Sequence, residues 1–199
     1  MVTKSAERPC ARDRLLDAAS ELFYEHGVHT VGIDRVIERA GVAKATLYST
    51  FGSKDELVRA YLQRRHEATR ERMTRELRRF RTPRERLLGV FEVQAELFGT
   101  PGYRGCAFIS ASAEAPTGST IEAASDEYRG WLRELLTDLA RDAGAEDPQA
   151  LACQLALVYD GAAVGARMDR DPQVAQVSRA IAGALVDAAI TSPHSSIPE

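Results

Sequence analysis

Residues 30–54 read TVGIDRVIERAGVAKATLYSTFGSK, and this stretch decides the fold of the first part of the chain. Apolar side chains spaced by three and four residues predict a short helix from about Ile33 to Ala40. Gly41 follows, and a glycine can end a helix there without the steric cost of a Cβ atom. A second short helix is predicted from about Lys44 to Thr50. Two helices around a glycine turn are typical of a helix-turn-helix, which places its second helix in the major groove of DNA.

The second helix of this pair carries few residues that could pack into a core. Leu47 is its one large aliphatic residue, and Phe51 lies four positions later. The other side chains are small or carry hydroxyl or ammonium groups, which suit phosphates and base edges. Glycine-turned helix pairs also occur in helical proteins that bind no DNA, so the flanking sequence has to decide between these two interpretations.

The flanks extend the pair to a larger helical unit. Residues 12–26 place leucine, alanine and phenylalanine side chains on one helical stripe, and Gly27 ends that helix. After the pair, Ser53 can cap another helix, and Glu56 three residues later completes a capping box. The predicted order is therefore helix, helix, turn, helix and then a long helix.

Residues 14–62, a quarter of the chain, resemble the N-terminal domain of TetR/AcrR-family transcriptional repressors without a gap. The most specific parts are AGV at 40–42, TLY at 46–48, Phe51 and SKDEL at 53–57. The resemblance implies an all-α, dimeric fold, in which an N-terminal three-helix helix-turn-helix domain is joined to a C-terminal helical domain for ligand binding and dimerisation. It also implies double-stranded operator DNA as a partner.

The same resemblance assigns roles on the DNA face. Lys44 and Ala45 would face base edges. Thr46, Tyr48, Thr50 and Lys54 would hold phosphates, and Tyr48 would also be in reach of a base. The chain departs from the family at Gly32, where a capping Ser or Thr is usual, and at Thr50, where an aromatic residue or His is frequent. The candidate DNA-binding residues are Lys44, Ala45, Thr46, Tyr48, Ser49, Thr50 and Lys54.

Charge is distributed unevenly along the 199 residues. Residues 1–81 carry 17 Lys and Arg against 12 Asp and Glu, a net charge of +5, whereas residues 82–199 carry a net charge of −8. A basic N-terminal part on an acidic body is what a regulator with one DNA-binding face should show. The N-terminus has no apolar signal segment, and no apolar run approaches membrane-spanning length, so we expect a cytoplasmic protein without a membrane partner.

No motif for catalysis, cofactor binding or metal binding is apparent in the sequence. Cys10, Cys106 and Cys153 are far apart and form no CxxC pair, and His26 and His29 flank a glycine instead of sharing a helix face. No nucleophile elbow, Walker loop or dinucleotide fingerprint is present. We therefore expect no enzyme activity, no cofactor and no metal. Cys106 is either a buried structural thiol or a redox-sensitive one.

The remaining sequence predicts a helical body. We expect a DNA-binding domain over residues 9–69, with the helix-turn-helix at about 32–51, and a ligand-binding and dimerisation domain over residues 70–191. Residues 1–8 and 192–199 are expected to be loose tails. The further predicted helices cover about residues 57–80, 87–98, 104–114, 121–139, 148–168 and 172–190.

The resemblance implies a small, largely apolar effector inside this body, and the sequence supplies suitable walls. Apolar and aromatic residues with a few polar groups recur on the inner stripes of four predicted helices. Each of them could equally serve only to fill the core. The candidate ligand-binding residues are Phe91, Gln94, Phe98, Cys106, Phe108, Ile109, Tyr128, Trp131, Leu132, Leu135 and Tyr159.

Assembly can be argued from the size of the DNA-binding element. A single helix-turn-helix buries too little surface for tight, specific binding, so we expect a homodimer on an approximately palindromic operator. The last two predicted helices are rich in Ala and Gly, which allow close helix approach. The candidate interface residues are Leu155, Tyr159, Ala162, Ala163, Val177, Ile181, Ala184 and Ala188.

These observations predict a DNA-binding transcriptional regulator, and specifically a repressor that a small, largely apolar effector releases from its palindromic operator. The alternative is an enzyme or a small-molecule carrier built on the helical body, with a helix-turn-helix that has no function of its own. Retention on DNA during a salt titration separates the two hypotheses.

Overall fold

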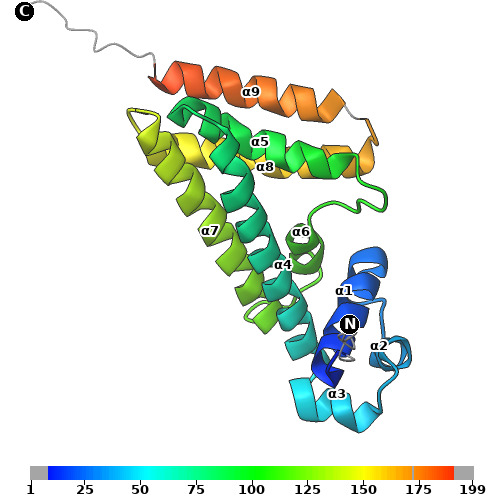
Figure 1. The fold of residues 1–199 in the computed structure, drawn as a ribbon. Helices are drawn as coiled ribbons and strands as arrows, with labels where there is room; N and C mark the ends of the chain where they lie inside the picture. Colours follow the sequence, from blue (N-terminus) through cyan, green and yellow to red (C-terminus); the bar gives the residue numbers. More distant parts are fainter. Residues whose placement is uncertain (1–8, 172, 191–199) are drawn as a thin grey trace, which may run out of the picture. The chain divides into compact units, whose positions relative to one another are not determined.

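The computed structural model describes residues 9–171 and 173–190, and every regular element in these ranges is helical (Figure 1). The predicted all-α class is confirmed. The expected loose tails and Pro172, the predicted start of the last helix, lie outside the described residues. The helices are α1 Ala11–His26, α2 Ile33–Ala40, α3 Lys44–Phe51, α4 Lys54–Glu76, the 3-10 turn η1 Leu77–Arg79, α5 Pro83–Phe98, α6 Ala107–Ser112, α7 Thr120–Asp142, α8 Pro148–Met168 and α9 Gln173–Ile190.

Capping side chains explain where two of these helices begin. Before α4, the Ser53 hydroxyl accepts a hydrogen bond from the backbone N–H of Glu56 at 3.1 Å, as the sequence predicts. Before α5, the Thr82 hydroxyl accepts from the N–H of Glu85 at 3.1 Å, and the Glu85 carboxylate accepts from the N–H of Thr82 at 3.0 Å. This reciprocal capping box lowers the pKa of Glu85, mainly through the backbone hydrogen bond from Thr82.

The chain divides into two compact units. The N-terminal unit contains the residues up to Arg65 together with Ala107–Ser125, and the C-terminal unit contains His66–Cys106 together with the residues from Asp126 onward. Helix α4 begins in the first unit and ends in the second, whereas α6 belongs to the N-terminal unit although it follows α5 in sequence. The division falls within α4, four residues before the domain boundary expected between residues 69 and 70.

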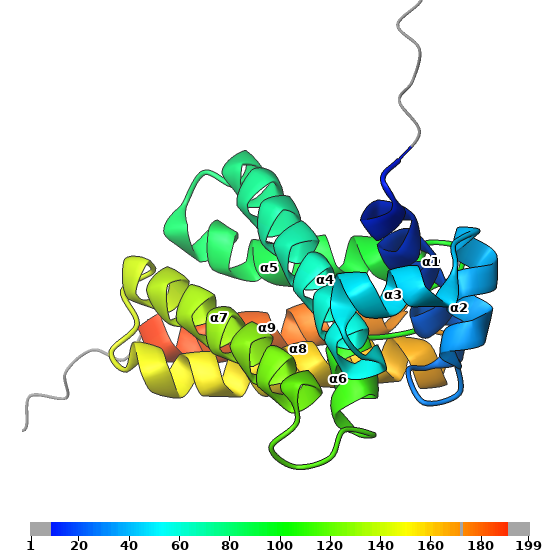
Figure 2. The same ribbon diagram turned by 90° about the horizontal axis from the view of Figure 1, so that it is seen from below.

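Helices α1, α2 and α3 form one cluster in the N-terminal unit, and they lie against one another in both views (Figures 1 and 2). The apolar stripe of α1 is buried, as its spacing predicts. The ring of Phe23 on α1 meets the ring of Tyr61 on α4 edge to face, with centroids 5.8 Å apart. The guanidinium of Arg65 lies 3.9 Å from the ring centroid of Tyr24, so the first turns of α4 are fixed to α1.

The C-terminal unit has its own hydrophobic core, made by the end of α4 with α5, α7, α8 and α9. Helix α9 lies beside both α5 and α8 (Figure 1). Leu87, Leu136 and Leu155 are completely buried in this core. Burial of each such side chain contributes roughly 1.5–3 kcal/mol to the free energy of unfolding.

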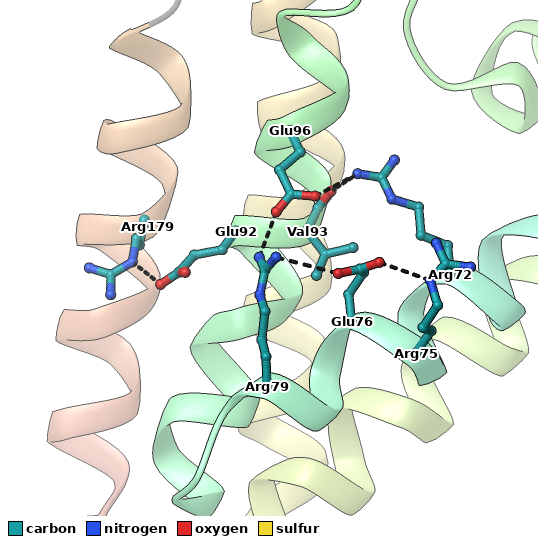
Figure 3. Close-up of polar contacts among 8 residues, drawn as sticks. All are labelled: Arg72, Arg75, Glu76, Arg79, Glu92, Val93, Glu96 and Arg179. Atoms are coloured by element: carbon teal, nitrogen blue, oxygen red, sulfur yellow. Dashed lines mark hydrogen bonds and ion pairs between the residues drawn. The ribbon is translucent and has the colours of Figure 1, made fainter.

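A network of ion pairs joins the end of α4 to α5 (Figure 3). Glu96 on α5 accepts hydrogen bonds from Arg72 of α4 at 2.9 Å and from Arg79 of η1 at 2.6 Å. Arg72 also donates to the backbone oxygen of Val93 at 2.9 Å. The two arginines hold the pKa of Glu96 below its usual value, with the Arg79 hydrogen bond as the main cause. Arginines at the end of α4 and in η1 therefore bind α5.

Gly89 on α5 provides a test of this packing, because the ring of Phe80 lies directly on it. A Cβ atom at this buried position would lie 2.5 Å from a ring carbon of Phe80. We predict that Gly89→Ala lowers the free energy of unfolding by about 1–3 kcal/mol, because overpacking outweighs the gain in helix propensity of about 1 kcal/mol. Urea unfolding curves measure the change.

Gly130→Ala in α7 is the matched control, since a Cβ atom there would meet no atom within 4 Å. This variant should raise the free energy of unfolding by up to about 1 kcal/mol, because alanine favours the helix. Equal stability of the Gly89→Ala and Gly130→Ala proteins would contradict the packing assigned to Phe80.

Candidate nucleic-acid interface

Helix α2 ends at a glycine, Gly41, in a way that is common among helices. Gly41 adopts the left-handed conformation with φ of 62°, which a residue with a Cβ atom avoids. Its N–H donates to the carbonyl of Glu38 at 3.2 Å, and the N–H of Val42 donates to the carbonyl of Ile37 at 3.2 Å. These two bonds make a Schellman motif, which satisfies the last carbonyls of α2 and sets the direction of the chain into α3. The glycine stop predicted from the sequence is confirmed.

Helix α3 is attached by few side chains, as its composition predicts. Leu47 is 0% exposed, and Phe51 is half-buried. Tyr48 is 45% exposed, so its ring and hydroxyl lie at the surface of the helix. The helix therefore combines one firm attachment with an exposed face.

The structure places the candidate DNA-binding residues on or beside this exposed face. Lys44, Ala45, Tyr48 and Ser49 are exposed, whereas Thr46, Thr50 and Lys54 are half-buried. The Thr50 hydroxyl donates to the carbonyl of Thr46 at 2.6 Å, and the Ser49 hydroxyl donates to the same carbonyl at 3.1 Å. These hydroxyl protons are used within the helix, so either group has to rotate before it can donate to a phosphate.

The two lysines of the candidate set are held by other parts of the N-terminal unit. The Lys44 ammonium lies 3.0 Å from the Asp34 carboxylate of α2, which raises the pKa of Lys44 through their hydrogen bond. Both side chains are more than half exposed, so solvent screens this pair and a phosphate or base edge can compete for the ammonium. The Lys54 ammonium donates to the backbone carbonyl of His29 at 3.4 Å.

Arg12 and His29 also lie beside this face, and no sequence pattern assigned either of them to it. The Arg12 guanidinium lies 5.6 Å from the ring centroid of Phe51, which brings a cation from α1 to the end of α3. His29, in the turn after α1, donates its N–H to the Glu114 carboxylate at 3.4 Å, and its Nε2 lies 2.7 Å from the Glu114 carbonyl oxygen. Contacts across 39 or 85 positions of sequence leave no local pattern that could have predicted them.

Several candidate effector residues come together in the C-terminal unit. The hydroxyls of Tyr128 and Tyr159 are hydrogen-bonded and buried, and burial raises the pKa of Tyr159 to about 12 and that of Tyr128 well above its usual value. Cys106 is close enough to influence both hydroxyls. The ring of Phe91 lies 6.1 Å from that of Tyr159. Gln94 donates to the Tyr159 carbonyl at 2.8 Å, while its buried Oε1 has no hydrogen-bond partner.

His66 on α4 belongs to this group but was not a sequence candidate. It is 6% exposed, and its ring lies 5.7 Å from that of Tyr128 and 5.3 Å from that of Trp131. Burial is the main cause that lowers its pKa, so the imidazole is neutral at pH 7. Its sequence neighbours, Arg65 and Glu67, gave this segment the pattern of a solvated helix and hid the buried position.

The remaining candidates for the effector site differ in where they lie. Leu132 is buried in the core of the C-terminal unit, and Leu135 packs against that core. Phe98 is half-buried, with its ring 5.3 Å from that of Tyr103. Phe108 and Ile109 are part of α6 and belong to the N-terminal unit.

The candidate interface residues fall into two groups. On α9, Val177, Ile181, Ala184 and Ala188 are exposed. On α8, all four candidates are buried inside the protomer, because this stripe of the helix faces the core. The exposed stripe of α8 instead carries Leu157 and Met168, which are 70% and 73% exposed, and Val164 between them. The buried candidates are Leu155, Tyr159, Ala162 and Ala163.

Within residues 9–171 and 173–190, no three His, Cys, Asp or Glu side chains gather in a way that could hold a metal ion. In the same part of the chain, no helix combines the length and apolar character needed to span a bilayer.

Residues 15–61 match the family described as bacterial regulatory proteins, tetR family. The HTH-type transcriptional activator FasR of Mycolicibacterium smegmatis is 32% identical to this chain over 149 residues, which cover 74% of this chain and 67% of FasR. The HTH-type transcriptional repressor ComR of Escherichia coli is 40% identical over 65 residues, which cover 32% of this chain and 31% of ComR.

Solved structures extend the similarity beyond the helix-turn-helix. A TetR-family transcriptional regulator from Streptomyces coelicolor superposes with a TM-score of 0.85 at 31% identity, and the match covers 90% of this chain and 95% of that one. A TetR transcriptional regulator from Streptomyces avermitilis gives a TM-score of 0.81 at 34% identity over 91% of this chain and 98% of that one. The similarity therefore includes the helical body.

Proposed function

Because the chain belongs to the TetR family of bacterial regulatory proteins and is a DNA-binding transcriptional regulator, we propose that it acts as a homodimeric repressor in the cytoplasm. A small, largely apolar effector releases it from a palindromic operator. The observation that carries this proposal is the exposed face of α3, with Lys44 and Tyr48, on a helix that Leu47 anchors. The relatives are named transcriptional regulators, so the alternative of an enzyme or carrier is not favoured.

The direction of regulation needs its own experiment, since FasR is named an activator and ComR a repressor. Selection of bound sequences from random DNA gives the operator and its symmetry together. A reporter gene behind that operator then measures the effect on transcription. Lower expression with the protein than without it supports repression, and higher expression contradicts it.

Our first functional prediction concerns the two lysines of the DNA face. Lys54→Ala should weaken binding to all duplexes about equally and lower the slope of log affinity against log salt by about one unit, as the loss of one phosphate contact implies. Lys44→Ala should instead relax base preference at one position of each half-site, at a cost of roughly 1–3 kcal/mol. Fluorescence anisotropy with the selected operator and with mismatched operators measures both effects.

Asp34→Asn sharpens this test, because it releases Lys44 from its ion pair and removes a negative charge near DNA. It should strengthen operator binding. Arg141→Ala, which removes an exposed cation from α7 in the C-terminal unit, is the matched control and should leave the isotherm unchanged. If Lys44→Ala and Lys54→Ala both bind as the parent protein does, α3 is not the helix that contacts DNA.

The dimer interface that we propose combines the exposed apolar stripes of α8 and α9. Its members on α8 are Leu157, Val164 and Met168, which replace the buried residues expected from the sequence. On α9 the exposed Val177 and Ile181 remain. Exposed large apolar residues that gather on two adjacent helices favour a four-helix contact with a second copy.

We predict that Leu157→Arg and Ile181→Arg each convert the protein to a monomer in light scattering, because a charge would then be buried at the two-fold contact. Both variants should also lose tight operator binding, since half-sites one or more helical turns of about 34–36 Å apart require two linked DNA-binding units. Leu97→Arg on α5 is the control, because Leu97 is also exposed but lies on neither helix. If the Leu157→Arg and Ile181→Arg proteins both remain dimeric, the interface lies elsewhere.

The effector site that we propose is the group around Tyr128, Tyr159 and Gln94 in the C-terminal unit. A buried acceptor without a partner, such as Gln94 Oε1, costs about 1–3 kcal/mol, and a ligand that donates a hydrogen bond would remove this cost. The effector class is therefore an apolar molecule with one hydrogen-bond donor. An effector acts only if it prefers the dimer that does not match the operator, and α4, which passes through both units, is the proposed link.

We predict that Gln94→Leu weakens binding of a DNA-releasing compound by about tenfold or more, because its donor would then lack an acceptor. The stability of the free variant should not fall by a comparable amount, since the unsatisfied Oε1 is lost as well. Trp131, which lies beside His66, should report binding through its fluorescence. The effector site lies elsewhere if a compound releases DNA without changing the fluorescence of Trp131 and binds the Gln94→Leu variant as tightly as the parent protein.

A further inference from the structure

A positively charged hollow lies in the C-terminal unit, lined by the connector after α5 and by the end of α8 with the residues that follow it. Its volume is about 750 Å³. Arg104 contributes to its lining from the connector, and Arg167 and Arg170 contribute from the end of α8. None of these three arginines has a part in the proposed function.

The charge of this hollow contrasts with that of the surrounding sequence. Residues 82–199 contain nine arginines and no lysine against 17 acidic residues, and a third of those arginines line this one hollow. Among the described residues of the lining, Asp171 supplies the carboxylate, and its Oδ1 accepts a hydrogen bond from the backbone N–H of Gln173 at 2.8 Å. Grouped guanidinium groups attract anions and bind phosphate or carboxylate oxygens in pairs.

The backbone lies close to the stem of one arginine and is left-handed at another. Gly105, with φ of 87°, lies so close to the stem of Arg167 that a Cβ atom there would be 2.9 Å from the Arg167 Cδ. Arg170 adopts the left-handed conformation with φ of 54°, which costs a residue with a side chain roughly 1–2 kcal/mol. Arg170 directly follows Asp169, the C-cap of α8, at the position where a left-handed residue commonly ends a helix.

Aromatic rings complete the wall of the hollow. Phe98 and Tyr103 are both half-buried, and their rings lie 5.3 Å apart with an angle of 54° between their planes. The Tyr103 hydroxyl donates to the Ala163 carbonyl at 3.5 Å, which fixes the connector to α8. Such rings offer a flat surface to a planar group next to the arginines.

We propose that this hollow binds a small organic phosphate. Arg104, Arg167 and Arg170 hold the phosphate oxygens, and the planar group that carries the phosphate lies against Phe98 and Tyr103. The site does not depend on the proposed repressor function, since it shares no residue with the DNA face. It is also independent of the hydrogen bond assigned to Gln94.

Isothermal titration calorimetry of the whole 199-residue chain with phenyl phosphate tests the proposal. Phenyl phosphate should bind saturably, and more weakly as salt is added. Arg104→Gln and Arg170→Asn should each weaken binding by about tenfold. Asparagine at position 170 removes the charge but tolerates the left-handed backbone, so this variant keeps the local fold. Phe98→Leu should weaken binding of phenyl phosphate but not of inorganic phosphate.

Matched controls make the result decisive. Arg133→Gln removes one exposed arginine from α7 outside the hollow and should leave the binding of phenyl phosphate unchanged. Lys54→Ala removes a cation from the DNA face and should also leave the binding of phenyl phosphate unchanged. Circular dichroism checks that each variant is folded. Absence of saturable binding up to roughly 10 mM phenyl phosphate would overturn the proposal. Equal losses in Arg133→Gln or Lys54→Ala would also overturn it, and tighter binding of benzoate would show a carboxylate site instead.

Discussion

The attachment of α3 through Leu47 is the constraint on which the N-terminal unit depends. A helix that contacts DNA has to be fixed while most of its surface stays exposed, and these demands conflict in a helix of eight residues. Complete burial of one leucine contributes roughly 1.5–3 kcal/mol without covering the polar face. Gly41, which ends α2 shortly before α3 begins, and Gly52, which ends α3, both have positive φ angles. Helices α1 and α2, which contact α3, then serve mainly to provide the apolar surface that receives it.

The ion pairs around Glu96 matter for geometry more than for stability. Pairs that are partly exposed contribute only about 0–1 kcal/mol each. Arg72 and Arg79 nevertheless approach one carboxylate from two points along the chain, and Arg179 of α9 pairs with Glu92 of α5 at 2.8 Å (Figure 3). This arrangement permits one register between the end of α4 and α5. The end of α4 is thereby held against α5 at several points.

Local signals in the sequence were sufficient for the helices and the turn, but not for side chains that meet across the fold. Gly41 and Ser53 marked their helix ends because the chemistry of a stop or a cap is contained within a few residues. On α8, large apolar side chains occur on both faces, so periodicity could not distinguish the buried stripe with Leu155 from the exposed one that carries Leu157. His66 was hidden by charged neighbours, and the contact of Arg12 with Phe51 joins distant positions.

The hydrogen bonds between His29 and Glu114 have a consequence for protein engineering. They close the turn after α1 with a residue that follows α6, so the DNA-binding part of this protein is discontinuous in sequence. A chimera that takes only the first 65 residues from another family member would bring a foreign partner to Glu114. Exchange of DNA specificity between relatives should therefore transfer residues 107–125 together with the N-terminal segment, as a single two-part cassette.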